Sequence, residues 1–351
     1  MNKQRNLSGV KEIARRANVS IATVDRVIHN RPGVSMKTKL IIEAIIKELN
    51  YQPNVLASRL ASGKVYNLGV LIPKSSVYSD FWDAPLKGIE RAEAEIKKYG
   101  ISVEIFFFDL TEKSTFIKAI ENLKAKKFDG MLISPSFLDE SVDYLRYCES
   151  HNIPVVLIDS NIEDHESLSY IGPPLFQSGF LGARLCQLCL PYPSKVLLVN
   201  ITKQSNSFNY IQIEKGFKRF FENTSSLEKC IKLVIDEIDQ PSIEVYLKKA
   251  FLNHPDIGAI FVMNSRVFSV ALFLESQNLG HIQLVGYDFL SENQRYLEMG
   301  TINFLICHKP EEQGYKGIMS LYHHLALNLP VDKEYYMPID IVTKENMDFY
   351  R

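Results

Sequence analysis

Polar side chains in the second part of the chain follow short runs of β-branched and aromatic residues. These side chains are Asp109 after EIFFF, Ser134 and Ser136 after GMLI, Asp159 after VVLI, Asn264 after AIFVM and Asp288 after LVGY. Carboxylate and amide oxygens accept hydrogen bonds in fixed directions, and the adjacent Phe81 and Trp82 can cover the apolar face of a ring. An aspartate at a strand end also commonly caps the next helix, so the prediction depends on several such residues converging. Together they suit a polar ring such as a sugar.

A second kind of chemistry is predicted near the N-terminus. Ser20 offers an N-cap oxygen to a helix that carries Ile21, Ala22 and Arg26. When such a helix is the second of a helix-turn-helix, it lies in the major groove and its first outward residues face base edges. An arginine can fork onto guanine, whereas Ile21 and Ala22 can contact only thymine methyl groups or read shape.

The charge of the chain supports this second prediction. The net charge of −1 conceals a basic segment, because residues 1–64 carry 12 Lys and Arg against 4 Asp and Glu, a net +8. The remaining residues carry 28 against 37, a net −9. Since neutralisation of phosphates dominates affinity for nucleic acid, residues 1–64 are the candidate nucleic-acid-binding part, although a solvated basic face would give the same count.

Three short helical patterns must position these residues. The first has Val10, Ile13, Ala14 and Ala17 on one face, and the second has Ile21, Val24, Val27 and Ile28 spaced for burial, at least in part. Ser35 begins a third helix, whose packing face is predicted to comprise Leu40, Ile41, Ala44, Ile45 and Leu49. The segment that follows can form a helix only from about Pro53 or Asn54 to Gly63, which is too short to be stable alone in water. Its Leu56 and Leu60 share one face and could wedge into a base step of the minor groove.

The acidic remainder alternates strand-like runs with amphipathic stretches. The predicted strands begin near Leu68, Val103, Gly130 and Val155, and again near Val196, Ile231, Ala259 and Leu284. The intervals between strand starts are nearly the same in the two sets, which predicts two α/β lobes, each a parallel sheet covered by helices. Ligands of such sheets bind beyond the carboxyl ends of the strands, so two facing lobes would share one cleft.

The first 64 residues resemble the lactose/galactose-repressor family. The resemblance rests on VSIATVDRV, GVSMKT and NYQPNVLASRL. It implies that Ile21, Ala22 and Arg26 read bases, that Asn54 begins a hinge helix of about 53–62, and that Leu60 wedges into the operator centre. The full expected DNA-binding set is Ser20, Ile21, Ala22, Thr23, Arg26, Asn30, Asn54, Leu56, Ala57 and Leu60. Asp25 replaces the usual serine and places a carboxylate on the DNA-facing helix.

The rest of the chain is similar to the periplasmic-sugar-binding-like effector domain of the same family. The segments FW, IDS, FVMNS, LVGYDF and FLICHKPEEQGYKG carry this likeness. It implies a ligand site made of Phe81, Trp82, Asp159, Asn264, Asp288 and His308. Two positions depart from the family pattern, because Ile213 stands where an arginine is common and His308 replaces a glutamine. The departures point away from a simple monosaccharide.

The expected architecture is a small all-α helix-turn-helix head with a hinge helix, residues 1–64, joined to a two-lobed α/β body of the type I periplasmic-binding-protein kind, residues 65–351. The N-lobe is predicted to comprise about 66–165 and 295–327, and the C-lobe about 166–292 and 330–351. We expect a ligand-responsive transcriptional regulator, by family default a repressor, that binds a near-palindromic operator as a homodimer. A sugar or sugar-like effector in the cleft would alter how the hinge helices pack. The alternative is a cytoplasmic small-molecule-binding protein or enzyme whose basic head has another role.

Other chemistries find weaker support. Cys186 and Cys189 lack a second cysteine pair and lie in an apolar stretch, and the adjacent His323 and His324 diverge by about 100° on a helix, so no metal site is expected. The sequence contains no GxGxxG, GxxxxGK[ST] or GxSxG motif, and we expect neither an enzyme nor a cofactor. No apolar run approaches the roughly 18 residues that span a bilayer, and the cysteines are odd in number and scattered, so a cytoplasmic protein without disulfides is expected.

Overall fold

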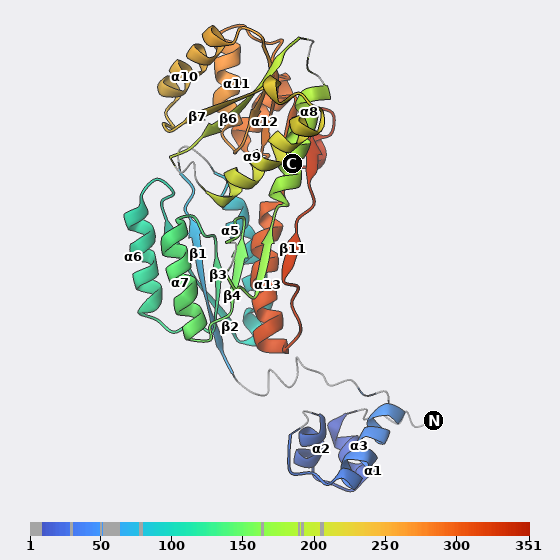
Figure 1. Cartoon of the computed structure of the whole chain (residues 1–351). Coiled ribbons are helices and arrows are strands. Elements are labelled where there is room, and N and C mark those ends of the chain that lie inside the picture. Colours follow the sequence, from blue (N-terminus) through green and yellow to red (C-terminus); the bar gives the residue numbers. More distant parts are fainter. Residues whose placement is uncertain are drawn as a thin grey trace. The chain divides into compact units, whose positions relative to one another are not determined.

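The computed structural model describes residues 9–28, 31–49, 51, 64–76, 80–162, 165–188, 190, 193–203 and 207–351 (Figure 1). The chain divides into two compact units, Met1–Lys64 and Val65–Arg351. Each unit has its own hydrophobic core. The predicted hinge helix of about 53–62 lies outside the described residues.

The first unit contains three helices, α1 (Val10–Ala17), α2 (Ile21–Ile28) and α3 (Met36–Glu48). Ile13, Val24 and Ile42, one from each helix, are fully buried together and form the centre of its core. Asn18 adopts a left-handed backbone with φ 51°, which turns the chain sharply between α1 and α2. The predicted three-helix head is therefore confirmed.

The predicted packing face of α3 was partly wrong. Leu40 and Ile41 are 58% and 44% exposed, and Ala44 is exposed as well. The buried residue is Ile42, and Ile45, Ile46 and Leu49 pack beside it. The run LIIEAII offers two overlapping apolar faces at helical spacing, so only the contacts of α3 with α1 and α2 decide which face is buried.

The second unit contains two six-stranded sheets. The first has the order β11-β5-β4-β3-β1-β2 and the second β12-β10-β9-β8-β6-β7. The strands of the first sheet are β1 (Tyr66–Pro73), β2 (Ile101–Phe108), β3 (Gly130–Ile133), β4 (Val155–Ile158), β5 (Ser169–Gly172) and β11 (Glu334–Tyr336). Those of the second are β6 (Lys195–Ile201), β7 (Cys230–Ile235), β8 (Ile257–Val262), β9 (Gln283–Tyr287), β10 (Phe304–Cys307) and β12 (Asp340–Val342).

Neighbouring strands pair in parallel, except that β12 runs antiparallel to β10. Each of the eight predicted strands is present and begins within two residues of its predicted start. The central positions of β1, β3, β4, β6, β8 and β9 are buried on both faces, which is why these runs are almost continuously apolar in sequence, whereas β2 and β7 alternate half-buried and exposed positions. The predicted pair of parallel α/β lobes is confirmed.

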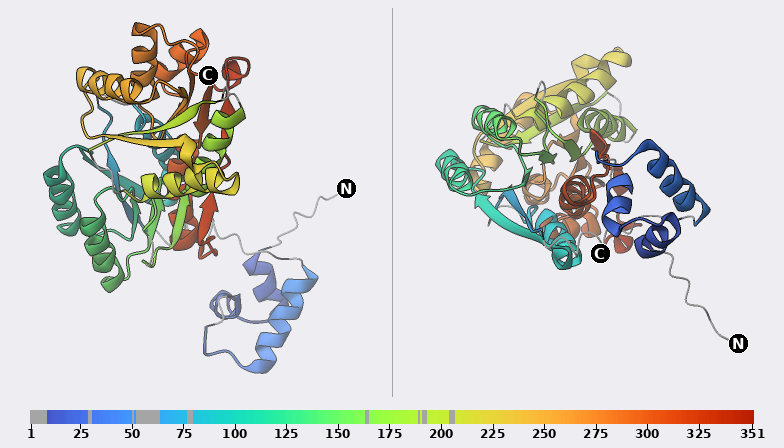
Figure 2. Two further views of the ribbon diagram at one scale, coloured as in Figure 1. Left: turned by 45° about the horizontal axis from the view of Figure 1, so that its top comes forward. Right: turned by 90° about the horizontal axis from the view of Figure 1, so that it is seen from below.

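Helices cover both faces of each sheet (Figure 2). Around the first sheet these are α5 (Asp83–Ile96), α6 (Lys113–Lys124), α7 (Leu138–Ser150) and α13 (Pro310–Leu327). Around the second sheet they are α8 (Leu175–Leu188), α9 (Phe208–Asn223), α10 (Gln240–Asn253), α11 (Val267–Ser276) and α12 (Ser291–Met299). In each lobe one face of the sheet is covered by two helices in close contact, α5 with α13 and α8 with α9.

Both of these helix pairs cross at glycines. A Cβ atom on Gly314 of α13 would lie 2.1 Å from the carbonyl oxygen of Pro85, and one on Gly179 of α8 would lie 2.0 Å from that of Ile213. Gly88 and Gly216 make the reciprocal approaches on the partner helices. The two backbones can come this close only because no side chain stands between them.

The chain passes between the lobes three times, and the predicted lobe boundaries differ from this path. The C-lobe was predicted to begin at about 166, but β5 still belongs to the first sheet. The chain was predicted to re-enter the N-lobe at about 295, but α12 and β10 belong to the second lobe. The terminal stretch from 330, predicted for one lobe, divides into β11 in the first sheet and β12 in the second. These strands have only three or four residues, too few for sequence to indicate which sheet they join.

None of the helices in the described ranges is long and apolar enough to cross a membrane. Cys148, Cys186, Cys230 and Cys307 are free thiols, whereas Cys189 lies outside the described residues.

Candidate functional site

The start of α2 is fixed by its own cap and by two valines. The Oγ atom of Ser20 accepts a hydrogen bond from the backbone N–H of Thr23 at 3.1 Å. Val24 and Val27 are buried against α1 and α3. The opposite side of the helix is therefore held facing outward.

The residues predicted to face base edges lie on this outward side. Ser20, Ile21, Ala22 and Arg26 are exposed, Ile21 by 50%, and Thr23 is partly buried. An isoleucine exposed at the start of a helix gains nothing from packing within the unit, so its position is consistent with an external contact. Asn30, Asn54, Leu56, Ala57 and Leu60 lie outside the described residues.

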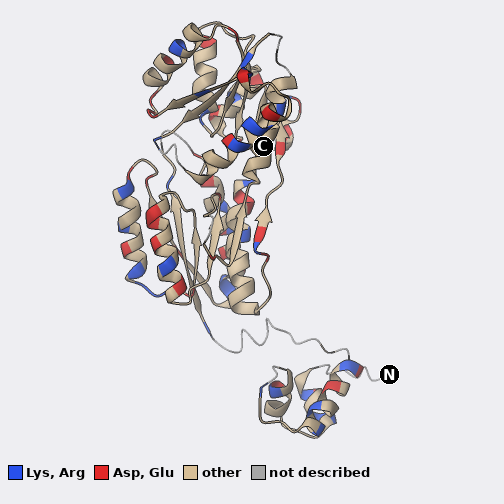
Figure 3. Ribbon diagram, viewed as in Figure 1, with Lys and Arg blue, Asp and Glu red and all other residues tan. Residues whose placement is uncertain are grey.

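Asp25, which departs from the family pattern, is paired. Arg31 donates to its carboxylate at 3.1 Å, which offsets the negative charge next to Arg26. Lys and Arg residues, blue in Figure 3, lie on all three helices of the unit. On α1 the carboxylate of Glu12 accepts hydrogen bonds from Arg15 and Arg16, which lower its pKa to about 2.

A pocket of about 200 Å³ lies in the second unit, between its two sheets, at the carboxyl ends of the strands. All six predicted ligand residues line it: Phe81, Trp82, Asp159, Asn264, Asp288 and His308. Asp109 and Ser136 also line it, whereas Ser134 is buried in the sheet. The volume is below the roughly 300–1,000 Å³ of pockets for drug-sized molecules, so it fits one small polar ligand.

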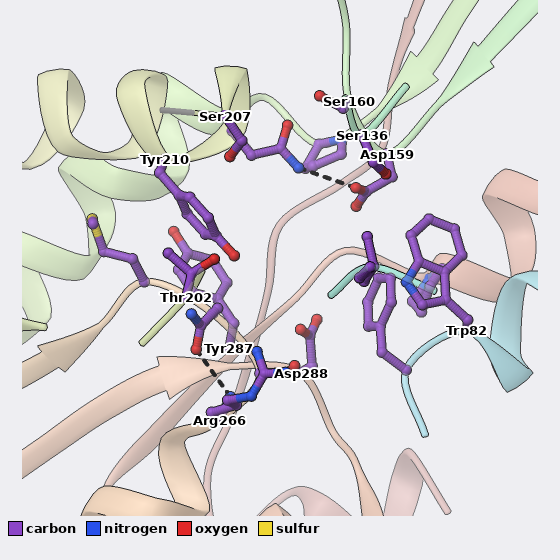
Figure 4. A pocket seen from close by; sticks show the side chains of 18 of the residues that line it. Trp82, Ser136, Asp159, Ser160, Thr202, Ser207, Tyr210, Arg266, Tyr287 and Asp288 are labelled. Carbon is purple, nitrogen blue, oxygen red and sulfur yellow. Dashed lines mark hydrogen bonds between the residues drawn. The ribbon is translucent and has the colours of Figure 1, made fainter. Parts of the chain in front are cut away.

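Asp159 and Asp288 hold equivalent places in the two lobes (Figure 4). Asp159 follows β4 and Asp288 follows β9, and both have a left-handed backbone, with φ 64° and 71°. The N–H of Asp159 donates to Ile171 of β5, and that of Asp288 donates to Ile306 of β10. This turn lets each carboxyl leave the sheet edge and point into the pocket.

The two carboxyls differ in their pKa. Burial raises the pKa of Asp159 to about 6, and the side-chain amide of Asn209, which donates to its Oδ2 at 3.0 Å, limits that rise. Burial, together with the negative charge of Asp159, raises the pKa of Asp288 to about 8. At neutral pH Asp288 is therefore mostly the neutral acid.

His308 is a buried, neutral imidazole whose ring is held by a hydrogen bond to a buried serine. Its Nε2 lies 2.9 Å from the hydroxyl of Ser178, which lies 2.8 Å from that of Tyr287. Burial lowers the pKa of His308 to about 3. Gln313 joins this group to the other lobe, because its Nε2 donates to the carbonyl of His308 and its Oε1 accepts the N–H of Asp159. His308 thus lines the pocket and also lies where the chain passes from β10 of one lobe to α13 of the other.

Other predicted residues also have structural partners. Asn264 donates to the carbonyl of Ile201 at 2.9 Å and accepts the backbone N–H of Arg266 at 3.1 Å, so its amide fixes the loop after β8. Trp82 is only 6% exposed and packs edge-on against Phe81, with 5.2 Å between ring centroids. Trp82 therefore belongs mainly to the core, and the partly buried Phe81 supplies the more open ring.

Asn209 and Arg266 are among the lining residues of this pocket that the sequence interpretation missed. Arg266 stands two residues after Asn264, within the loop of a predicted strand end, so its position carried a signal. The sequence around Asn209 gave no such signal, because Asn209 contacts Asp159 only when the two lobes come together. Within the described part of the chain, no group of three or more His, Cys, Asp or Glu residues is placed to hold a metal ion.

Comparison with known proteins agrees with both units. Residues 69–328 match the family described as "Periplasmic binding protein domain", and residues 9–54 match "Bacterial regulatory proteins, lacI family". Catabolite control protein B of Bacillus subtilis is 32% identical over 177 residues, which are 47% of this chain and 54% of that protein. An HTH-type transcriptional regulator of Clostridium acetobutylicum is 32% identical over 161 residues, 46% of each chain. The chain thus spans about half the length of the curated relatives it matches.

Solved structures resemble the body. A putative LacI transcriptional regulator from Bacteroides fragilis superposes with a TM-score of 0.76 at 27% identity, covering 82% of this chain and 100% of its own. A glucose-galactose binding protein from Geobacillus stearothermophilus gives a TM-score of 0.69 at 22% identity, covering 81% and 99%. The second likeness shows the fold alone. With its head and body each matched over its main elements, the chain belongs to the lacI family of bacterial regulatory proteins and carries a periplasmic binding protein domain as its body.

Proposed function

We propose that the chain is a LacI-type transcriptional regulator whose head binds operator DNA and whose body binds a sugar-type effector. The observation that carries this proposal is the outward face of α2, where Ser20, Ile21, Ala22 and Arg26 are exposed while Val24 and Val27 are buried. A helix held in this way in a basic three-helix unit has the geometry of a recognition helix.

Arg26 is the residue proposed to read a base directly. Its guanidinium can donate two hydrogen bonds to O6 and N7 of guanine, while Ile21 and Ala22 contact thymine methyl groups. One head covers too few base pairs for specificity, so two heads of a homodimer would bind two half-sites of a nearly palindromic operator. The hinge positions Asn54, Leu56, Ala57 and Leu60 would contact the minor groove between them.

The pocket of the body is the proposed effector site. Asp159 and Asp288 face it from opposite lobes and can accept hydrogen bonds from hydroxyl groups, and the ring of Phe81 can lie against an apolar sugar face. Glucose-galactose binding is ascribed to one protein of this fold, and catabolite control to relatives of the chain. Both support a carbohydrate-linked effector.

Coupling between the two sites would follow from closure of the lobes. A ligand that contacts Asp159 and Asp288 together favours the closed arrangement, since neither lobe alone offers both groups. In a dimer this would move the N-terminal lobes and change whether two hinge helices can pack together. A coupling free energy of about 1 to 3 kcal/mol changes operator affinity by about 5-fold to 150-fold.

The test is DNA selection with the full chain, followed by fluorescence anisotropy on the selected site. Arg26→Ala should cost about 1 to 3 kcal/mol and relax the preference at a single position of each half-site. Arg219→Ala, an exposed arginine on α9 of the body, is the control and should leave DNA affinity unchanged. The proposal would be contradicted if no palindromic site is selected, or if both substitutions lower DNA affinity equally. Either result would favour the alternative, a small-molecule-binding protein whose basic head has another role.

A further inference from the structure

Arg266 lines the effector pocket without an ion-pair partner. Its side chain is partly buried, and its Nε is shielded from water with no acceptor in the described part of the chain. No carboxylate of the described residues lies within ion-pair distance of its guanidinium. Burial lowers the pKa of Arg266, and the titratable neighbour that opposes this lowering is the tyrosine Tyr210, not a carboxylate.

A buried guanidinium Nε without an acceptor is energetically unfavourable. A guanidinium removed from water loses hydration that only hydrogen bonds to an acceptor can replace, and it stays charged at any physiological pH. Lys74, another cation of the pocket, is by contrast paired with Asp109 at 3.4 Å. Lys203 also lines the pocket, but it is exposed and keeps its hydration. Arg266 is thus the partly buried pocket cation that remains available to a ligand.

The surroundings of Arg266 add to its positive potential. Arg266 is the N-cap residue of α11, so the N–H groups of the first turn and the positive end of the helix dipole lie next to it. Its backbone is fixed by the hydrogen bond to Oδ1 of Asn264 at 3.1 Å. This corner of the pocket is therefore rigid and electropositive.

The other walls are of opposite character. Asp159 and Asp288 accept hydrogen bonds through their carboxyl oxygens, and the ionised carboxylate of Asp159 disfavours a second negative group beside it. A ligand that satisfies all three residues must donate from one part and carry a negative charge on another. The apolar side chain of Ile213 also lines the pocket, at a position where the family commonly has an arginine.

From this geometry we infer that the pocket selects a monosaccharide acid, whose carboxylate pairs with Arg266 while its hydroxyl groups donate to Asp159 and Asp288. The inference rests on the proposed effector function of the pocket. A planar carboxylate matches the fork of a guanidinium and brings one negative charge. A phosphate ester would bring nearly two into a cavity that already contains two carboxyls, which disfavours it.

The test is isothermal titration of the full chain at pH 7 with matched pairs, D-glucuronate against D-glucose and D-galacturonate against D-galactose, together with D-gluconate and D-glucose 6-phosphate. We expect at least one acid to bind about 10-fold to 100-fold more tightly than its neutral partner, as one charge-assisted bidentate contact provides. Arg266→Gln should weaken binding of the acid more than binding of its neutral partner and so remove this preference. Arg266→Lys should retain part of the preference, and Arg219→Gln on α9 should change nothing.

A second measurement does not require the right stereoisomer. Because Arg266 is unpaired in the empty pocket, Arg266→Gln should keep or raise the melting temperature of the ligand-free protein, whereas a structural role for Arg266 predicts a fall. A fall, equal binding of acids and neutral sugars, or tighter binding of the phosphate ester would overturn the inference. If neutral sugars bind as tightly as the acids and shift operator affinity, the sugar-acid inference fails but the regulator proposal stands. If no member of the panel binds, the inference and the carbohydrate effector fail together.

Discussion

The two lobes of the body share one plan and differ at the point where they meet the ligand. Both have the strand order 2-1-3-4-5 with an added edge strand, and both have a glycine crossing between two helices on one face. Both also place an aspartate with a left-handed backbone after the fourth strand, Asp159 in one and Asp288 in the other. The fold therefore supplies two equivalent carboxyls to one pocket.

The difference lies in what the opposite lobe offers to each carboxyl. Asn209 of α9 reaches across and donates to Asp159, whereas no described side chain donates to the carboxylate of Asp288. Burial raises the pKa of both carboxyls, to about 6 for Asp159, where the Asn209 amide limits the rise, and to about 8 for Asp288, where the charge of Asp159 adds to it. Equivalent backbone positions thus acquire different protonation states from residues beyond their own lobe.

The glycine crossings test whether the lobes are also equivalent in stability. Gly179→Ala and Gly314→Ala each place a Cβ about 2 Å from a backbone carbonyl, so one backbone must move. We expect each to lower the free energy of unfolding by about 3 kcal/mol, the upper end of the range for overpacking. Chemical denaturation of the full chain measures this. Gly280→Ala is the control, because nothing lies within 4 Å of its added Cβ. A loss in one lobe alone would break the equivalence.

The aspartates test the difference between the lobes through pH. A carboxyl whose pKa is raised in the folded protein binds more protons there than in the unfolded chain, so stability falls as pH rises from its ordinary value to the raised one. The decline due to Asp159 should end near pH 6, and that due to Asp288 near pH 8. Asp288→Asn should therefore stabilise the empty protein at pH 8 by about 1 to 3 kcal/mol, less than the full pKa difference implies because water enters the cleft.

Asp159→Asn separates the two titrations further. It should remove the decline below pH 6 and also lower the pKa of Asp288, whose neighbouring charge is then absent. Denaturation curves at pH 5, 6, 7 and 8 compare both variants with the unsubstituted protein. Identical pH profiles for the two variants would show that the carboxyls titrate alike, and would remove the asymmetry described above.

Asn209→Ala should make the two aspartates more alike. Without the amide donor at 3.0 Å, the pKa of Asp159 should rise above about 6. We expect stability at pH 7 to fall by about 1 kcal/mol, as for a typical lost hydrogen bond. The loss should shrink at pH 4.5, where Asp159 is protonated in both proteins. A loss that is independent of pH would assign Asn209 to packing instead.

The smallest expected effect concerns a further, exposed contact between lobes. Ser291 of α12 donates to Oδ2 of Asp80 at 3.0 Å, in an exposed position. Ser291→Ala should cost no more than about 0.5 kcal/mol, because water can replace the hydroxyl. Differential scanning calorimetry can compare it with Asn209→Ala. A cost above that of Asn209→Ala would identify Asp80, and not Asp159, as the principal link between the lobes.

Much of this arrangement could be predicted from sequence. Strands such as VVLI and LVGY are buried on both faces, so their apolar runs mark them clearly, and the aspartates that follow them must emerge at the carboxyl edge. Val24 and Val27 likewise identified the inward side of α2 and, by exclusion, the outward side. These features depend on periodicities that a local segment carries by itself.

The remainder depends on contacts between distant segments. The run LIIEAII did not reveal which face of α3 is buried, because both faces are apolar and only the neighbouring helices decide. The short strand β11 gave no sign that it joins the first sheet rather than the second. The meeting of Asn209 with Asp159 requires both lobes to be assembled, and the raised pKa of Asp288 follows from that assembly.

The three passages between lobes also bear on how the protein is made. The first sheet is completed by β11, and α13 covers one of its faces, yet both are encoded after nearly all of the second sheet. A nascent chain that has emerged as far as Gly172 must therefore leave Leu132 and Ile158 open to water until α13 leaves the ribosome. The N-terminal lobe cannot finish folding before its partner is synthesised, so the two lobes mature as one unit.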